Sequence, residues 1–348
     1  MKKKITDFLG NPWGQRISLV ILVMLIMLIF EPRFFRLSNV YSIVLSISIY
    51  GIMACGMLMV ILVGGIDLCQ GSTAAMAAIL VTETVINNGY TAASFYQGLA
   101  LALGAALLLG LLHGVECAYF KIPAFVLTFA TQYAVRGLMN VHTHATNLFP
   151  LGNDHLYYLV GNGRVLGIPM PIVLFVIYAI LATIILGHTK FGRRVYAVGG
   201  NPEAAELDGV NSKLHIVVAY VASSVSAALG GIVLSCMNMQ ASYVTASGYE
   251  GHVLTAMVVG GINLAGGEGG VSGAVFGALL VGIINNALIL LNVPATYQKF
   301  VQGVIIVAAV ALNVYTHRRS LGLTGVNVHI FDNPKEETKA ESNGGTAQ

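Results

Sequence analysis

Residues 37–72 read LSNVYSIVLSISIYGIMACGMLMVILVGGIDLCQGS, and Asp67 is the one charged side chain among them. A helix that crosses the hydrocarbon core of a bilayer needs about 20 predominantly apolar residues, and the uncharged run from Leu37 to Ile66 is longer than that. Asp67 follows a glycine pair and precedes a second apolar run. The stretch therefore predicts a membrane-spanning helix, a break at the glycines and another helix beyond the break.

The composition of the whole chain is that of a membrane protein. Hydrophobic residues make up 56% of the chain and charged residues 9%, whereas soluble domains carry about 25% charged residues. The 40 glycines fit this class, because glycine is more frequent in membrane helices than in soluble ones. The net charge of +3 is too small to indicate nucleic-acid binding. The four cysteines have no metal-site spacing, so we interpret them as small buried apolar residues.

The pattern of apolar segments predicts an all-α polytopic membrane protein of about ten transmembrane helices, with broken or re-entrant segments. Segment 251–263 is short and glycine-rich, as a re-entrant helix would be. The spacings GLLHG (110–114) and GAVFG (273–277) predict close helix packing. The predicted spans are about 14–30, 41–63, 70–87, 95–118, 122–140, 169–187, 214–237, 251–263, 271–291 and 297–315.

The distribution of basic residues predicts the orientation. Ten spans place both termini on one side, and positively charged residues favour the cytoplasmic side. With the N-terminus inside, 13 of the 18 Lys and Arg residues fall in cytoplasmic segments. We therefore expect both termini in the cytoplasm, a membrane domain over residues 1–319 and a disordered cytoplasmic tail over residues 320–348.

The glycine break occurs twice. VGGIDLCQGS (63–72), the first break motif, is echoed by VGGINLAGGEGG (259–270), the second break motif, in which Asn263 replaces Asp67. Five matched positions in a glycine-rich chain can arise by chance, but internal repeats and broken helices are recurring features of transporters. The echo predicts a weak internal repeat or a shared structural demand.

The residues of the two break motifs have a local structural logic. Two glycines permit the backbone angles that end a helix. Asp and Asn are good N-cap residues, and Asp67 with Gln70 has capping-box spacing. Because Asn263 cannot carry a proton, the echo favours a helix break that shapes a gate without titrating. The motif residues are Gly64, Gly65, Asp67, Gln70, Gly260, Gly261 and Asn263.

The segment FGRRVYAVGGNPEAAELDGVN (191–211) contains the signals of a short helix. Asn201 is the predicted N-cap, Pro202 stands at the first helical position, Glu203 lies in the first turn and Gly209 ends the helix. A helix of two turns is not stable alone. It must dock either on its own protein or on a partner.

Four segments together resemble the permease subunits of bacterial monosaccharide ABC importers, the ribose, galactose, arabinose and xylose type. They are GGIDLCQGS, KIPAFVLTFAT, FGRRVYAVGGNPEAAELDGVN and GYEGHVLTAMVVGGINLAGGEGGVSGAVFGALLVGIINNALILLNVPATYQ. The resemblance runs in order from about residue 38 to 315. The chain departs from the family pattern at Cys69-Gln70, where Ser-Val is usual, and in its longer polar tail.

The resemblance implies a multi-pass protein of the bacterial inner membrane with three kinds of partner. These are a second permease subunit, the same or homologous, a periplasmic sugar-binding protein and a cytoplasmic ABC ATPase. Segment 191–211 would be the coupling loop that contacts the ATPase. This chain lacks the phosphate-loop motif G-x-x-x-x-G-K-[ST], so we expect that it is not itself an enzyme. ATP and Mg would bind to the partner ATPase, and we expect no cofactor on this chain. The implied coupling residues are Arg193, Arg194, Asn201, Pro202, Glu203, Ala204, Ala205, Glu206, Leu207 and Gly209.

A route for a neutral sugar needs hydroxyl and amide groups inside the spans. The candidate pathway residues are Thr128, Gln132, Asn285 and Asn286. Each of them can instead bridge helices by hydrogen bonding. The adjacent amides of Asn285 and Asn286 are the best pair, because they point in different directions. Arg136 lies near a predicted outer span end, where interfacial contact explains it.

Two other classes of function are alternatives to an ABC importer permease. An ion-coupled secondary sugar transporter that works without an ATPase would use Asp67 as its ion-binding carboxylate. A membrane enzyme would need paired carboxylates, a nucleophile elbow or a metal motif, and the sequence contains none of them.

Overall fold

The computed structural model of the chain describes residues 12–152, 155–294, 296–305 and 307. These residues belong to one compact unit that ends at Ala309. The predicted boundary at residue 319 and the predicted tail lie outside the described residues. The last predicted span, 297–315, is described only in part.

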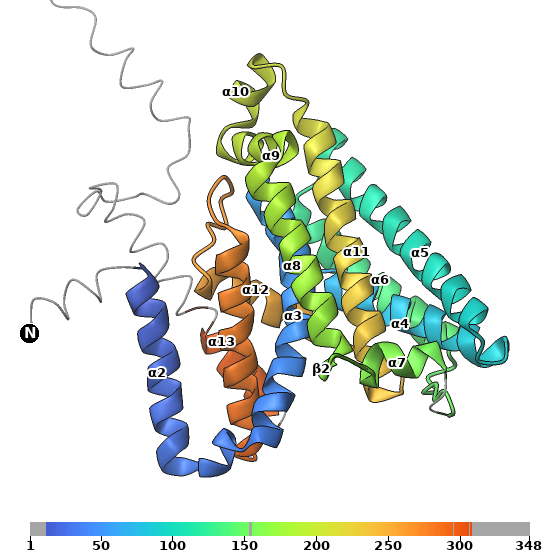
Figure 1. Cartoon of the computed structure of the whole chain (residues 1–348). Helices are drawn as coiled ribbons and strands as arrows, with labels where there is room; N and C mark the ends of the chain where they lie inside the picture. The colour runs from blue at the N-terminus through green and yellow to red at the C-terminus, as the bar shows by residue number, and fades with distance from the viewer. Residues whose placement is uncertain (1–11, 153–154, 295, 306, 308–348) are drawn as a thin grey trace, which may run out of the picture. The chain divides into compact units, whose positions relative to one another are not determined.

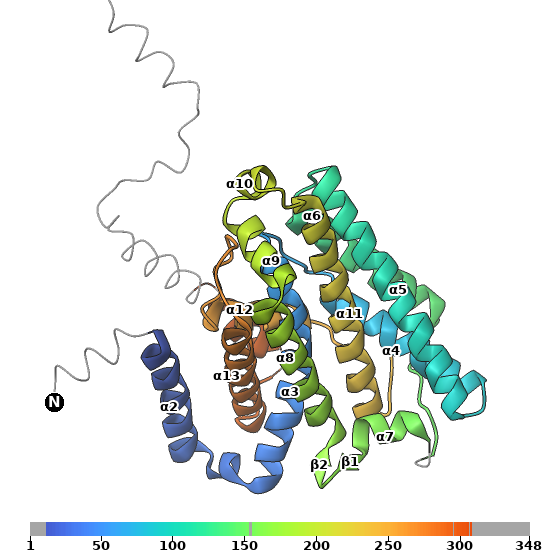
Figure 2. The same cartoon turned by 45° about the horizontal axis from the view of Figure 1, so that its top comes forward.

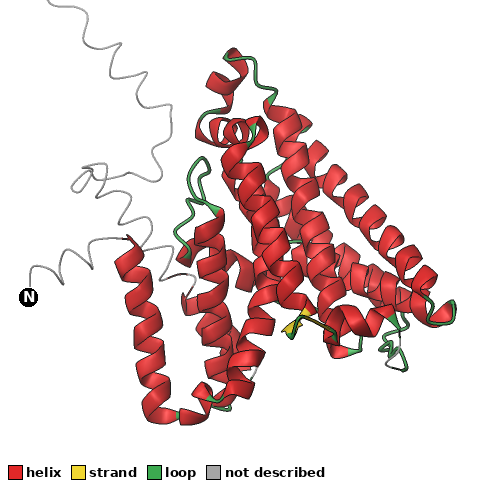
Figure 3. Cartoon of the chain, in the orientation of Figure 1, coloured by secondary structure: helices red, strands yellow, loops and turns green. Residues whose placement is uncertain are grey.

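Helices make up most of the described chain (Figure 3), and strands β1 and β2 form a small antiparallel hairpin. The prediction of an all-α protein is therefore confirmed. Figure 1 labels the elements. They are α2 (Pro12–Phe30), η1 (Pro32–Phe35), α3 (Leu37–Leu62), α4 (Gln70–Asn87), α5 (Ala92–Tyr119), α6 (Ala124–His142), α7 (Leu156–Asn162), β1 (Arg164–Val165), β2 (Ile168–Pro169), α8 (Met170–His188), α9 (Lys190–Gly200), α10 (Pro202–Leu207), α11 (Ser212–Asn238), α12 (Tyr249–Val259) and α13 (Val271–Leu290), and residues 296–305 are also helical.

Five of the described helices are long and apolar enough to cross a membrane, namely α3, α5, α8, α11 and α13. The full set of ten spans and the internal repeat remain predictions. Helix α12 has 11 residues, which is a length of about 16 Å against a hydrocarbon core of about 30 Å. This short helix lies where the sequence predicts a re-entrant segment.

Helices α3 and α11 form the centre of the unit. Every residue of α3 from Ile47 to its end is buried, and α3 packs against α11, α13, α8 and α12. Helix α11 packs against α5, α3 and α4. In contrast, α8 exposes many large apolar side chains, which is the surface that contact with lipid requires.

The two predicted small-residue spacings do bring helices together. A Cβ atom on Gly114 of α5 would lie 2.6 Å from the Cα atom of Val217 in α11. A Cβ atom on Gly277 of α13 would lie 1.8 Å from the carbonyl oxygen of Ala256 in α12. Only glycine allows these backbones to approach so closely.

Candidate functional site

The first break motif ends α3 with a left-handed glycine. The amide of Gly64 donates to the carbonyl of Ile61 at 2.9 Å, and the amide of Gly65 donates to the carbonyl of Val60 at 2.9 Å. Gly64 has a φ of +80°. This pair of bonds around a left-handed residue is a Schellman motif, which satisfies the last carbonyls of the helix.

The second break motif ends α12 in the same way, displaced by one residue. The amide of Gly261 donates to the carbonyl of Val258 at 2.9 Å, and the amide of Ile262 donates to that of Met257 at 3.0 Å. The left-handed residue is now Gly261, with a φ of +71°. The prediction that both glycine pairs end helices is confirmed.

The prediction that Asp67 caps the next helix is wrong. Helix α4 begins at Gln70 with Cys69 as its N-cap. Asp67 is buried, its Oδ1 accepts from the amide of Cys69 at 2.9 Å, and its Oδ2 accepts from the hydroxyl of Ser223 at 2.7 Å. The buried carboxylate thus finds its second donor on α11 rather than in the first turn of α4.

Gln70 makes no capping box either. Its Nε2 donates to the hydroxyl oxygen of Ser223 at 2.9 Å and to the carbonyl of Met53 at 3.2 Å. Gln70 therefore connects the start of α4 to α11 and α3. The sequence gives no local signal for these partners, because they lie far away along the chain.

Asn263 repeats the local turn of Asp67 and is likewise no N-cap. Its Oδ1 accepts from the amide of Ala265 at 3.0 Å, as Asp67 accepts from Cys69. Helix α13 begins later, at Val271, with Gly270 as its N-cap. In both motifs the side chain stabilises a turn over two residues, which Asp and Asn do well.

The two break motifs and α9 meet backbone to backbone, at a place we call the glycine joint (Leu62–Gly64, Gly199–Gly200 and Gly266–Gly269). The amide of Gly267 donates to the carbonyl of Leu62 at 3.0 Å. A Cβ atom on Gly199 would lie 1.7 Å from the Leu62 oxygen. The hydroxyl of Tyr196 donates to the carbonyl of Gly269 at 2.8 Å. The sequence predicts each glycine pair but not their meeting.

The predicted coupling loop contains α9 and α10, which lie at the end of the bundle where α8 ends and α11 begins (Figures 1 and 2). Asn201 caps α10 as predicted, because its Oδ1 accepts from the amide of Ala204 at 3.0 Å. Pro202 begins the helix, and Gly209 follows it with a φ of +79°. The predicted short helix is therefore confirmed.

Helix α10 buries one small side chain and exposes the others. Ala205 is buried, whereas Glu203 and Glu206 are exposed. Leu207 is 90% exposed. On α9, Arg193 and Arg194 are exposed as well. The loop thus presents an apolar side chain flanked by charges, and this surface is available to a partner.

The candidate pathway residues on α6 take two different roles. Thr128 is fully buried, and its hydroxyl oxygen accepts from the amide of Leu68 at 3.1 Å. Thr128 therefore braces the first break motif. Gln132 lies one turn further on, and its Nε2 donates to Oε1 of Glu250 at 2.9 Å. Arg136 lies one more turn along α6 and is half-buried, and its Nη1 donates to the carbonyl of Tyr243. Its interfacial position stays a prediction.

The adjacent amides of α13 point to different partners. Asn286 exchanges two hydrogen bonds of 2.9 Å with Asn39, which is a bridge between α13 and α3. The Nδ2 of Asn285 lies 3.1 Å from Nδ1 of His252 and 3.4 Å from the hydroxyl of Tyr50. Asn286 thus fulfils the bridging alternative, while Asn285 belongs to a different cluster.

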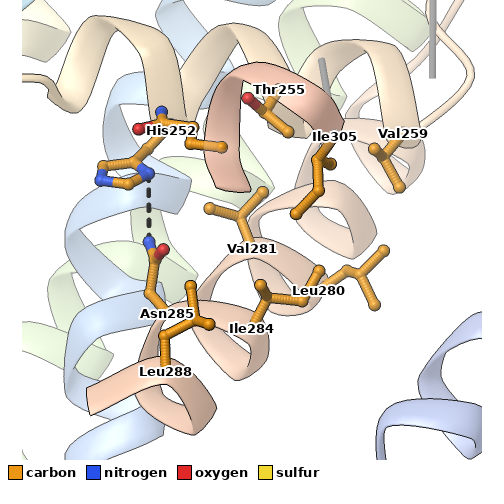
Figure 4. Close-up of a pocket in the computed structure, with 10 residues that line it drawn as sticks. His252, Thr255, Val259, Leu280, Val281, Ile284, Asn285, Leu288 and Ile305 are labelled. Atoms are coloured by element: carbon orange, nitrogen blue, oxygen red, sulfur yellow. Dashed lines mark hydrogen bonds between the residues drawn. The ribbon is translucent and has the colours of Figure 1, made fainter. Parts of the chain in front are cut away.

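Asn285 and His252 line a cavity between α12, α13 and the helix after residue 295 (Figure 4). The wall is mostly apolar, with Thr255 and Gln302 as its other polar side chains. The ring of Tyr50 lies 4.9 Å from that of Tyr249 and 5.4 Å from that of His252, measured between centroids. Aromatic faces and amides are therefore found together at the start of α12.

Three residues of this region were not predicted from the sequence, namely Glu250, Ser223 and His252. Glu250 has a signal that could have revealed it, since it is the one acidic residue between Asp208 and Glu268. A lone carboxylate in a long apolar region needs partners, and the structure supplies Gln132.

Comparison with known proteins identifies the family. Residues 39–310 match the family described as branched-chain amino acid transport system / permease component. The chain belongs to this permease family. It is 37% identical to the ribose import permease protein RbsC of Escherichia coli (strain K12), over 85% of this chain and 92% of that protein.

Other relatives carry names of the same kind. The L-arabinose transport system permease protein AraH of Escherichia coli (strain K12) is 35% identical over 89% of this chain and 93% of its own length. The D-allose transport system permease protein AlsC of the same organism is 29% identical over 87% and 91%. No solved structure matches the chain significantly. The predicted resemblance to permeases of monosaccharide ABC importers is confirmed, and the family with its apolar helices indicates a multi-pass inner-membrane protein.

Proposed function

We propose that this chain is the membrane-spanning permease subunit of an ATP-driven importer of a neutral monosaccharide. The observation that carries the proposal is the 37% identity to a ribose import permease over 85% of the chain. The L-arabinose and D-allose permeases match it over similar lengths. Ribose, arabinose and allose are all polyhydroxylated and uncharged, so the shared chemistry defines the substrate class although it leaves the individual sugar open.

The proposed mechanism assigns ATP hydrolysis, with its Mg, to a cytoplasmic ABC ATPase. The exposed face of α10, with Leu207 flanked by Glu203 and Glu206, would contact that partner. A movement of α10 reaches α9 through the chain, because Asn201 ends one helix and begins the next. Both termini, which lie outside the described residues, would be on the ATPase side.

The glycine joint supports a path from that contact to the membrane gates. Gly199 lies against the carbonyl of Leu62, and the amide of Gly267 bonds to the same carbonyl. A displaced α9 therefore moves the end of α3 and the loop after α12 together. Alternating access then follows if ATP binding on the partner favours one of two arrangements of this joint.

The other two proposed partners complete the importer. A periplasmic binding protein would deliver the sugar on the side away from α10. A second permease subunit, identical or homologous, would complete the pathway. Gln132 and Asn285 are the proposed pathway residues, whereas Thr128 and Asn286 hold segments in place.

The surroundings of Asp67 favour this mechanism over ion-coupled transport. Its carboxylate already accepts hydrogen bonds from Cys69 and Ser223. Its equivalent in the second break motif, Asn263, makes the same turn without an ionisable group. A structural role accounts for both residues.

Uptake measurements test the proposal. The gene would be deleted from its host, and uptake of radiolabelled D-ribose, L-arabinose, D-allose and L-leucine would be compared with and without a plasmid copy. We expect uptake of one or more of the sugars, and none of leucine, to depend on the chain. It should also be lost when the phosphate-loop lysine of the partner ATPase is replaced. The proposal would be overturned if the chain supported leucine uptake. It would also be overturned if sugar uptake persisted without the ATPase and was lost when the proton gradient was removed.

A further inference from the structure

A guanidinium and a carboxylate lie in the same region inside the protein without forming an ion pair. Gln132 of α6 bonds to Glu250 of α12, and Arg136 lies one turn beyond Gln132 on the same helix, yet no ion pair joins Arg136 to Glu250. Nη2 of Arg136 and Oε2 of Glu250 are both shielded from solvent, and neither has a hydrogen-bond partner among the described residues. Such atoms are rare in folded proteins, because each loses its hydration without compensation.

Both groups are held in place by their other atoms. Gln132 donates to Oε1 of Glu250 at 2.9 Å, and Nη1 of Arg136 donates to the carbonyl of Tyr243. The free oxygen of Glu250 lies against the first turn of α4, where a Cβ atom on Gly71 would be 2.0 Å from it. These contacts hold both side chains in place, so Arg136 and Glu250 cannot form an ion pair by simple side-chain rotation.

The position is also where two helices begin. Helix α4 starts at Gln70 and α12 starts at Tyr249, and the contact between Glu250 and Gly71 joins their first turns. Helix α3 ends at the glycine joint, and the loop that follows α12 passes through it, so both break motifs link this region to the joint. In transporters built from broken helices, substrates bind where half-helices begin.

One free charged donor beside one free charged acceptor matches a pair of neighbouring hydroxyl groups. A hydroxyl can donate to the carboxylate while the next accepts from the guanidinium. A monovalent or divalent cation fits less well, because Arg136 opposes it and no group of three metal-ligating side chains occurs among the described residues. The two charges cancel, which suits an uncharged ligand.

We infer that Arg136, Gln132 and Glu250 form a recognition site for a vicinal diol of the transported sugar. The inference rests on the proposed function and adds the residues that select the substrate. In the arrangement described here the site is closed around its free atoms. Movement of α12 relative to α6 would admit the sugar, and the diol would replace the missing hydrogen bonds.

A comparison of variants with deoxy sugars tests the inference. The sugar whose uptake depends on the chain is measured beside its single-deoxy analogues, in the intact importer, for the wild type and for Glu250→Gln. In the wild type, removal of the recognised hydroxyl should lower uptake roughly ten- to hundred-fold, as loss of a hydrogen bond to a charged group does. Glu250→Gln should lower uptake of the parent sugar to a similar extent. The variant should then take up the parent sugar and the deoxy analogue equally well.

The controls separate recognition from folding. Glu116→Gln neutralises another half-buried carboxylate, on α5, and should leave the ratio of parent to analogue unchanged. Membrane abundance of each variant is measured by immunoblot, and Arg136→Lys serves where Glu250→Gln does not accumulate. The inference is overturned if the analogue and the parent sugar fall by the same factor in the variant. A chain that moves no sugar at all would instead overturn the proposed function, and this site with it.

Discussion

The carbonyl oxygen of Leu62 accepts a hydrogen bond from the amide of Gly267, at 3.0 Å. This bond joins the end of α3, directly before the first break motif, to the second break motif in the loop that follows α12. The same oxygen lies where a side chain on Gly199 would be, so α9 shares the contact. One carbonyl thus lies against the second break motif and against the loop that we propose for the ATPase.

A methyl group on Gly199 should uncouple the importer. Gly199→Ala would place its Cβ atom 1.7 Å from the Leu62 oxygen, so the backbones must separate. Overpacking of this kind costs about 1–3 kcal/mol, and we expect sugar uptake to fall about ten-fold or more. Gly200→Ala is the matched control, because nothing lies within 4 Å of its added atom. Equal uptake by the two variants would show that the joint carries no coupling.

Replacement of Asp67 by Asn and by Leu should affect transport differently. In Asp67→Asn, Oδ1 still accepts from Cys69 and Nδ2 can donate to the hydroxyl oxygen of Ser223, so most transport should remain. Asp67→Leu leaves two buried donors unsatisfied, at about 1–3 kcal/mol each, and should lose folding or activity. Uptake and thermal unfolding in detergent measure both outcomes. A well-folded Asn variant without transport would support ion coupling instead.

These two sites show what the sequence can and cannot predict. The glycine pairs end helices through local backbone geometry, so Leu62 and Val259 could be predicted as helix ends. The cap at Asn201 follows from local chemistry in the same way. The partner of Asp67, in contrast, is Ser223, which is 156 residues away. No local pattern specifies that distance, because it depends on how α11 packs.

The candidate pathway shows the same division. Asn285 and Asn286 were predicted to point in different directions, and they do, because successive residues of a helix lie about 100° apart. The packing of α12 and α3 decides which of the two amides lines a cavity. The periodicity of apolar residues in the sequence does not reveal that packing. Glu250 was missed for a related reason, since its role depends on α6, more than a hundred residues earlier.

The acidic face of α10 should be needed for coupling. Glu203 and Glu206 are exposed, so their replacement by alanine leaves the core intact, and alanine favours the helix. We expect the double variant to assemble with its ATPase but to lose substrate-stimulated ATP hydrolysis. Asp208→Asn, also exposed but beyond the last helical residue, is the control. Normal stimulated hydrolysis by the double variant would remove these two glutamates from the coupling contact.

Substitution of the adjacent amides should separate stability from transport. Asn286→Ala removes both hydrogen bonds to Asn39, and in a membrane such bonds contribute about 0.6 to 1.7 kcal/mol. Its uptake should therefore decrease only as far as its membrane abundance does. Asn285→Ala changes the cavity wall and removes the contacts with His252 and Tyr50, so uptake for each assembled molecule should fall as well. If Asn285→Ala transports normally for each assembled molecule, the cavity beside His252 is not part of the sugar's route.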